Sequence, residues 1–152
     1  MQMRRLNFPP YPLRIKSREN IPQVFDVVRK KYVLLTPEEW VRQHSLHFII
    51  ENKKYPPGRI LVERRLVVEG MEKRIDLAVC HPDGSILLLV ECKAPSVKID
   101  QGVFDQIARY NWEARAEFLM VTNGMQHYYC QMDYTNQQYT FLEDLPEYIR
   151  SD

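Results

Sequence analysis

Apolar residues gather in short segments that have the length and composition of β-strands. Five such segments cover residues 60–68, 74–80, 86–93, 118–122 and 127–132, and residues 27–35 have a strand-like composition interrupted by three basic residues. Segment 86–93 begins with five apolar residues in succession, which is typical of a central strand covered on both faces. Asp83 and Gly84 form the strongest turn signal, so segments 74–80 and 86–93 are expected to pair as a hairpin.

Capping residues and helical spacing predict two long helices. Thr36 is a good N-cap, Pro37 suits the first helical position, and Glu39 stands where a capping-box partner belongs, so a helix is expected from Pro37 to about residue 51. A second helix is expected over residues 100–116, where apolar residues recur at helical spacing. Residues 145–149 are expected to form a short helix.

The order of these elements predicts a single α/β domain with a mixed central sheet flanked by helices. Residues 1–26 are rich in proline and are interpreted as an extended N-terminal arm. Residues 27–132 form the expected core, built on one sheet, and residues 133–152 are a C-terminal extension. The whole chain of 152 residues fits one compact domain.

Composition excludes several classes of protein. No apolar run approaches the roughly 20 residues of a membrane helix, and the N-terminus does not have the pattern of a signal peptide. Three cysteines without CxxC spacing argue against a disulfide framework and a structural zinc, so a reducing cytoplasm is expected. The five glycines never cluster into a phosphate-binding loop. His44 and His47 lack a third ligand at a suitable spacing.

The overall charge of +1 conceals an asymmetry along the chain. Residues 1–75 hold 16 Lys/Arg against 8 Asp/Glu, whereas residues 76–152 hold 5 against 12. A basic half can follow a phosphate backbone and an acidic half can hold divalent cations. The alternative is that the two halves intermix on folding and the asymmetry disappears.

The candidate chemistry lies at the end of the apolar strand. Glu91 and Lys93 are two residues apart and therefore share a face, whereas Cys92 points to the opposite one. The hairpin brings Asp76 beside Glu91. Two adjacent carboxylates repel each other, and a divalent cation with oxygen ligands would relieve that repulsion. A nearby lysine can orient the attacking water or stabilise developing negative charge. The alternative interpretation is a structural ion triad at the end of the sheet.

These residues resemble the PD-(D/E)XK nuclease superfamily, in which an Asp precedes a (Asp/Glu)-x-Lys strand. Here Asp76 is followed by fourteen intervening residues and then Glu91-Cys92-Lys93, with Ile75 in place of the usual proline. Gln106 and Tyr110 resemble the Gln-x-x-x-Tyr motif of the N-terminal nuclease domain of type I restriction-enzyme R subunits. Residues 35–43 resemble the first helix of that family. The resemblance spans roughly residues 27–125 and implies a restriction-endonuclease-like fold.

The resemblance implies Mg²⁺- or Mn²⁺-dependent hydrolysis of DNA. Asp76, Glu91 and the backbone carbonyl of Cys92 would bind the metal, and Lys93 would complete the catalytic centre. Gln106 and Tyr110 would support it, as would Glu39, for which a capping role alone is the competing interpretation. Gln106 could instead be an exposed helix residue and Tyr110 part of the core. Backbone-binding candidates are Arg42, which could equally be a surface ion-pair member, Arg64, Arg65, Lys73 and Arg74.

Several alternatives share these residues. The chain could be a catalytically silent DNA-binding or assembly module of a restriction or repair complex, or it could cleave RNA or a branched substrate. A plain structural α/β domain is the third alternative. The expected partners are DNA and other restriction-system subunits or a separate motor, with no membrane, and homodimerisation is compatible with the sequence.

Overall fold

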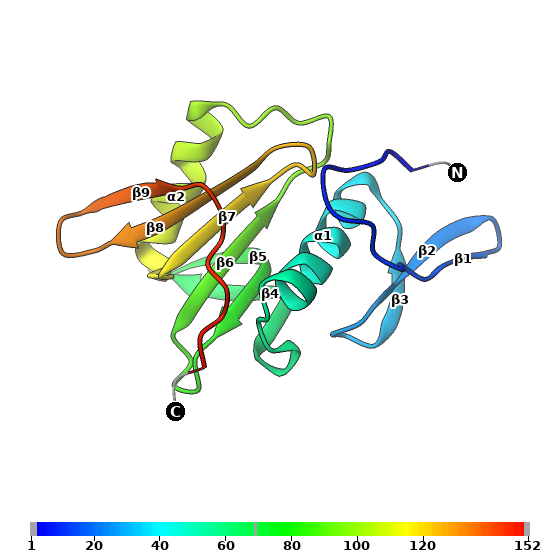
Figure 1. Ribbon diagram of the computed structural model, residues 1–152, viewed down its shortest axis with the longest axis horizontal. Coiled ribbons are helices and arrows are strands. Elements are labelled where there is room, and N and C mark those ends of the chain that lie inside the picture. The colour runs from blue at the N-terminus through cyan, green and yellow to red at the C-terminus, as the bar shows by residue number, and fades with distance from the viewer. Residues whose placement is uncertain (1–2, 69, 151–152) are drawn as a thin grey trace.

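The computed structural model describes residues 3–68 and 70–150, which form two sheets around α1 (Figure 1). The larger sheet has six strands in the order β4-β5-β6-β7-β8-β9. Their bounds are Ile60–Val68, Met71–Cys80, Ile86–Cys92, Phe118–Thr122, His127–Asp133 and Gln138–Leu142. β6 and β7 are parallel and all other neighbours are antiparallel, so the sheet is mixed as expected.

The hairpin β5–β6 and the crossover to β7 place the ends of the central strands. Leu77 pairs with Val90 in the hairpin, and Gly84 in its turn has a φ of +91° that glycine adopts without strain. After β6 the chain passes through α2, Gln101–Ala114, before β7 joins β6 in parallel. A parallel neighbour requires such a crossover, which explains why a helix separates these two strands.

Alternate residues of β6 divide the core between the two faces of the sheet. Leu88 and Val90 belong to the apolar cluster that contains α1 residues such as Val41 and Leu46. Leu89 belongs to the cluster that contains Phe104 and Ile107 of α2. Burial on both faces accounts for the uninterrupted apolar run of this strand.

The helix α1, Pro37–His47, begins where the capping pattern predicts. The Thr36 hydroxyl accepts a hydrogen bond from the backbone N–H of Glu39 at 3.0 Å. A π-helical segment, Phe48–Asn52, follows α1 directly, so the helical region ends close to the expected boundary. The short 3₁₀ helix Pro57–Arg59 then leads into β4.

A second, three-stranded sheet precedes α1. Its strands are β1, Ile15–Arg18, β2, Ile21–Asp26, and β3, Lys31–Leu34, paired antiparallel in the order β1-β2-β3. The expectation of a single sheet is therefore wrong, and residues 15–26 are strands rather than an extended arm. These strands are short and β1 is exposed along its length, so they carry no strong apolar pattern.

The C-terminal region also differs from expectation. β9 was not predicted, and residues 145–149 form no helix. Instead this segment crosses the sheet as an extended strap, held by bonds from the Tyr55 hydroxyl to the carbonyl of Pro146 and from the Tyr148 N–H to the carbonyl of Lys53 (Figure 1). Burial of Leu145 fixes the strap. Within residues 3–68 and 70–150, no helix is both long and apolar enough to span a bilayer.

Candidate active site

A cleft of about 580 Å³ opens between the small sheet, the start of α1 and the strands β4, β5 and β6. Asp76, Glu91, Cys92 and Lys93 all line it, together with Glu39. The residues that the sequence assigned to one centre therefore share one cavity. The residues 31–34 of β3 form the opposing wall.

Both carboxylate oxygens of Asp76 have partners. Oδ2 accepts a hydrogen bond from the backbone N–H of Cys92 at 2.8 Å, which ties β5 to the end of β6. Oδ1 accepts from Nη2 of Arg42 at 2.8 Å and lies 3.3 Å from its Nε. The side chain is buried, so these bonds replace the water that an ionised carboxylate would otherwise need.

Glu91 forms no hydrogen bond to a cationic side chain among the described residues of the cleft. Removal from water and, after it, the adjacent Asp76 carboxylate raise the pKa of Glu91 to about 8, against the opposing effect of Lys93. Extending the β5–β6 register by one pair places Glu91 opposite Asp76, as the hairpin predicted. A cation bound beside Glu91 would favour its ionised form and so offset both causes of this raised pKa.

Lys93 lies directly after β6 and its position is fixed by the backbone. Its N–H donates to the carbonyl of Thr122 in β7 at 2.8 Å, so the strand pairing continues past the last residue of β6. The side chain is half-buried and its charge favours ionisation of Glu91. Lys93 and the two carboxylates therefore line the same cleft, and their catalytic role stays a prediction.

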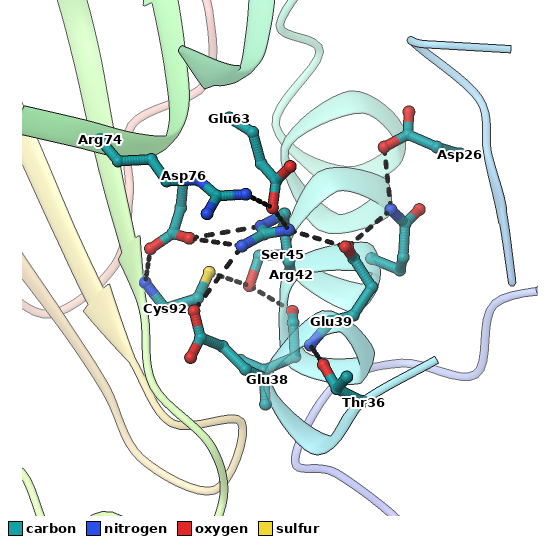
Figure 2. A network of polar contacts seen from close by, with 12 residues as sticks. Asp26, Thr36, Glu38, Glu39, Arg42, Ser45, Glu63, Arg74, Asp76 and Cys92 are labelled. Atoms are coloured by element: carbon teal, nitrogen blue, oxygen red, sulfur yellow. Dashed lines mark hydrogen bonds and ion pairs between the residues drawn. The ribbon is translucent and has the colours of Figure 1, made fainter. Parts of the chain in front are cut away.

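Arg42 occupies the centre of the carboxylates (Figure 2). Its Nη1 lies 2.7 Å from Glu39 and 2.6 Å from Glu63, and its Nη2 lies 2.8 Å from Asp76 and 3.6 Å from Glu38. The side chain is only 7% exposed. The sequence suggested a surface ion pair or a phosphate ligand, but this guanidinium is buried and bonded to carboxylates, so its placement favours a structural role.

Glu39 uses its side chain inside the cleft. Its carboxylate accepts from Arg42 at 2.7 Å and from Nε2 of Gln43 at 3.1 Å, rather than serving as a capping-box partner alone. Burial raises the pKa of Glu39, and Arg42 offsets part of this effect. Glu39 therefore lies beside the predicted centre, with its charge already balanced by an arginine.

Glu63 is a cleft residue that the sequence gave no reason to select. It has a φ of +51° and lies opposite Asp76 in the β4–β5 register, between the pairs Val62–Leu77 and Arg64–Ile75. Its carboxylate lies 2.6 Å from Arg42, 2.7 Å from Arg74 and 3.0 Å from Arg29. These contacts join β4 to α1 and to the β2–β3 turn and form only in the folded chain, so the residue was missed.

Gln106 and Tyr110, the supporting pair predicted on α2, lie in different surroundings. The Tyr110 hydroxyl is buried with no hydrogen-bond partner in the described part of the chain, and Nζ of Lys73 lies 3.9 Å from the centre of its ring. Burial raises the pKa of Tyr110, and the charge of Glu91 contributes to that rise, which places this tyrosine near the centre. Gln106 is exposed and does not line the cleft.

The predicted backbone-binding arginines also occupy different places. Arg74 lines the cleft and pairs with Glu63. Arg65 is exposed and pairs with Glu72 at 3.2 Å, and Arg64 is exposed and lies outside the cleft. Of these three residues, only Arg74 is positioned to meet a ligand in the cleft.

The donor set of the cleft fits a hard divalent cation. Asp76 on β5 and Glu91 on β6 provide carboxylate oxygens, and the backbone carbonyl of Cys92, the residue after Glu91, provides a third oxygen. Glu91 has no cationic hydrogen-bond donor among the described residues, which leaves its charge for such an ion. Over the same residues, however, no three His, Cys, Asp or Glu side chains are already arranged to hold a metal. Asp76 is bound to Arg42 instead.

Comparison with known proteins agrees with this fold. Residues 37–146 match the family model described as the N terminus of the type I restriction enzyme R protein. A solved fragment described as an HsdR subunit of a type I restriction enzyme from Vibrio vulnificus YJ016 has a similar fold, with a TM-score of 0.52 and 20% identity. The match covers 74% of this chain and 24% of that one. None of the curated proteins matches the chain.

Proposed function

The chain belongs to the family of type I restriction enzyme R protein N-terminal domains, and from this membership and the cleft we propose that it hydrolyses DNA phosphodiester bonds with Mg²⁺ or Mn²⁺. The observation that carries the proposal is the half-buried carboxylate of Glu91, which lies beside Asp76 in the cleft without a hydrogen-bonded cation among the described residues, with Lys93 two residues further on. This arrangement agrees with the PD-(D/E)XK pattern of the sequence.

Each residue has a role that its position allows. Asp76, Glu91 and the Cys92 carbonyl would hold the cation, which supplies charge neutralisation at the scissile phosphate. Nζ of Lys93 would donate to the attacking water or to a phosphate oxygen and stabilise the negative charge that develops there. Tyr110 would fix the surroundings of Glu91, and Glu39 would hold Arg42 beside Asp76.

A second candidate function is supported by Arg42. Its guanidinium already neutralises Asp76 and Glu39, so the cleft can be stable without a metal. In that case the chain would be a catalytically silent DNA-binding or assembly module. The two candidates differ in whether a divalent cation binds at Glu91.

A plasmid-nicking assay with Mg²⁺ or Mn²⁺, combined with calorimetric titration of Mn²⁺, separates the candidates. The nuclease proposal expects nicking and metal binding in the unsubstituted chain. Glu91→Gln should lose both, and Lys93→Met should lose nicking but keep metal binding. Lys98→Met, at an exposed lysine near the same strand end, is the matched control and should retain both. Absence of metal binding in the unsubstituted chain would reject the nuclease and favour the silent module.

The relation to a larger assembly follows from the same family. The chain spans about a quarter of the length of the Vibrio vulnificus fragment that it matches. We therefore propose that it works with other restriction-system subunits or with a separate motor. RNA in place of DNA as competitor in the nicking assay tests the alternative substrate.

A further inference from the structure

The outer face of the small sheet carries both cations and aromatic rings. Lys16 of β1 lies opposite Gln23 of β2, and Phe25 of β2 lies opposite Tyr32 of β3. Gln23 and Phe25 are two residues apart on one strand, so all four side chains share one face. The Arg14 guanidinium lies 3.9 Å from the centre of the Phe25 ring, and Nζ of Lys16 lies 4.0 Å from that of Tyr32. The two rings contact each other edge-on, with centres 5.2 Å apart. We call this surface the β1–β3 face.

The cations of the β1–β3 face lack protein counter-charges. Arg14, Lys16 and Arg18 have no carboxylate within 4.0 Å in the part of the chain that the structure describes. By contrast, Arg29, on the turn between β2 and β3, pairs with Asp26, Glu39 and Glu63. The face therefore presents three positive charges that a polyanion could neutralise.

Exposed apolar side chains lie among these cations. Ile21 is 48% and Leu34 is 55% exposed, and both belong to the β1–β3 face by strand alternation. The outside of a DNA duplex offers phosphates but no unstacked bases that would cover such residues. A single strand offers both, because its bases can lie on aromatic, apolar and guanidinium surfaces while its phosphates meet the cations.

The β1–β3 face is fixed in position relative to the catalytic cleft. Asp26 at the end of β2 is fully buried and accepts from Nε2 of Gln43 in α1 at 3.0 Å. Tyr32 and Leu34 also line the cleft that contains Asp76. Because β3 belongs both to the β1–β3 face and to the wall of the cleft, a nucleic-acid strand bound on this face would lead into the cleft.

We propose that the β1–β3 face binds a single-stranded segment of the nucleic-acid substrate and leads it into the cleft. Arg14, Lys16 and Arg18 would contact phosphates, and Tyr32 would contact a base. The small sheet precedes residues 37–146, the part that matches the family model. The inference rests on the proposed function, because it defines which form of substrate that function uses.

Binding of a fluorescein-labelled single-stranded DNA oligonucleotide, measured by anisotropy in EDTA, tests the proposal on the full chain. The double variant Arg14→Gln/Lys16→Gln should bind on the order of tenfold more weakly. The slope of its log affinity against log salt concentration should be shallower by about 1.4, the value expected when two phosphate contacts are lost. Tyr32→Leu should weaken binding at least about fivefold with an unchanged salt slope. Circular dichroism melting verifies that each variant is folded.

The control removes the same charge elsewhere. Arg59 and Arg150 are exposed and do not line the cleft, so Arg59→Gln/Arg150→Gln should bind as tightly as the unsubstituted chain. Equal loss in both double variants, or no loss in either, would overturn the proposal. An equal loss on a duplex of the same sequence would overturn the single-strand assignment. Because no metal is present, these outcomes are independent of whether the chain cleaves DNA.

Discussion

Replacing Arg42 by methionine should destabilise the folded chain strongly, because this side chain balances several buried carboxylates. Its guanidinium lies 2.6–2.8 Å from Glu39, Glu63 and Asp76. Methionine retains most of the apolar stem, so little packing is lost and the change reports mainly on charge. The substitution therefore measures what this cation contributes to the cleft.

The carboxylates do not depend equally on Arg42. Glu63 is 23% exposed and keeps Arg29 and Arg74 as partners, so it loses little. The side chain of Asp76 is only 10% exposed and retains one backbone N–H, whereas Glu39 retains Gln43 and, at 3.5 Å, Arg29. Leaving such buried charges without their partner costs about 3–5 kcal/mol. For a domain of this size the melting temperature should fall by roughly 10 °C.

Urea unfolding at pH 7 measures this difference, with Arg109→Met on the exposed side of α2 as the matched control. The control should change the free energy of unfolding by less than about 0.5 kcal/mol. At pH 4 the cost of Arg42→Met should shrink, because burial raises the pKa of Glu39 and loss of Arg42 removes a cation that lowers it, so Glu39 can take up a proton. Ca²⁺ should stabilise the variant more than the unsubstituted chain, since Asp76 becomes free to bind it. A cost below about 1 kcal/mol at pH 7 would refute this account of the cleft.

Three further predictions follow from single residues. Glu91 has a folded-state pKa of about 8 against 4.5, so the stability it contributes is complete below pH 4.5 and is lost as pH rises through 8. The free energy of unfolding of Glu91→Gln, measured by urea unfolding, should therefore rise relative to that of the unsubstituted chain as the pH goes from 5 to 9. The expected relative rise is on the order of 3 kcal/mol. Thr36→Ala should lose about 1 kcal/mol in the same measurement, whereas Thr36→Ser should lose little. Gly124→Ala should lower the melting temperature, because φ is +86° and the new Cβ would lie 2.8 Å from Leu6 Cδ2.

The sequence predicted those elements whose stability is local or whose faces are fully buried. β6 was recognisable because both of its faces are covered, and α1 because Thr36 caps it. β1 and β9 were not predicted because they are largely exposed and therefore have no marked apolar pattern. Such strands are stabilised by pairing with a neighbouring strand. The predicted C-terminal helix is absent because a short isolated helix is only marginally stable. The extended segment is stabilised instead by packing of Leu145 and Tyr148 on the core cluster that contains residues of the π-helical segment and β4, and by the hydrogen bond from the Tyr148 N–H to the carbonyl of Lys53.

Only the part of the candidate site that lies on one local element of structure could be predicted from the sequence. Asp76, Glu91 and Lys93 lie on one hairpin, so the strand period and one turn suffice to bring them together. The contact between Arg42 and Asp76 depends on how α1 packs across the sheet, and the contacts of Glu63 depend on how α1 and the β2–β3 turn pack against β4. Local patterns contain neither. The sequence therefore predicts the acidic centre, whereas the arginine that balances it follows only from tertiary packing. For the proposed nuclease, that arginine is the group with which a divalent cation must share Asp76.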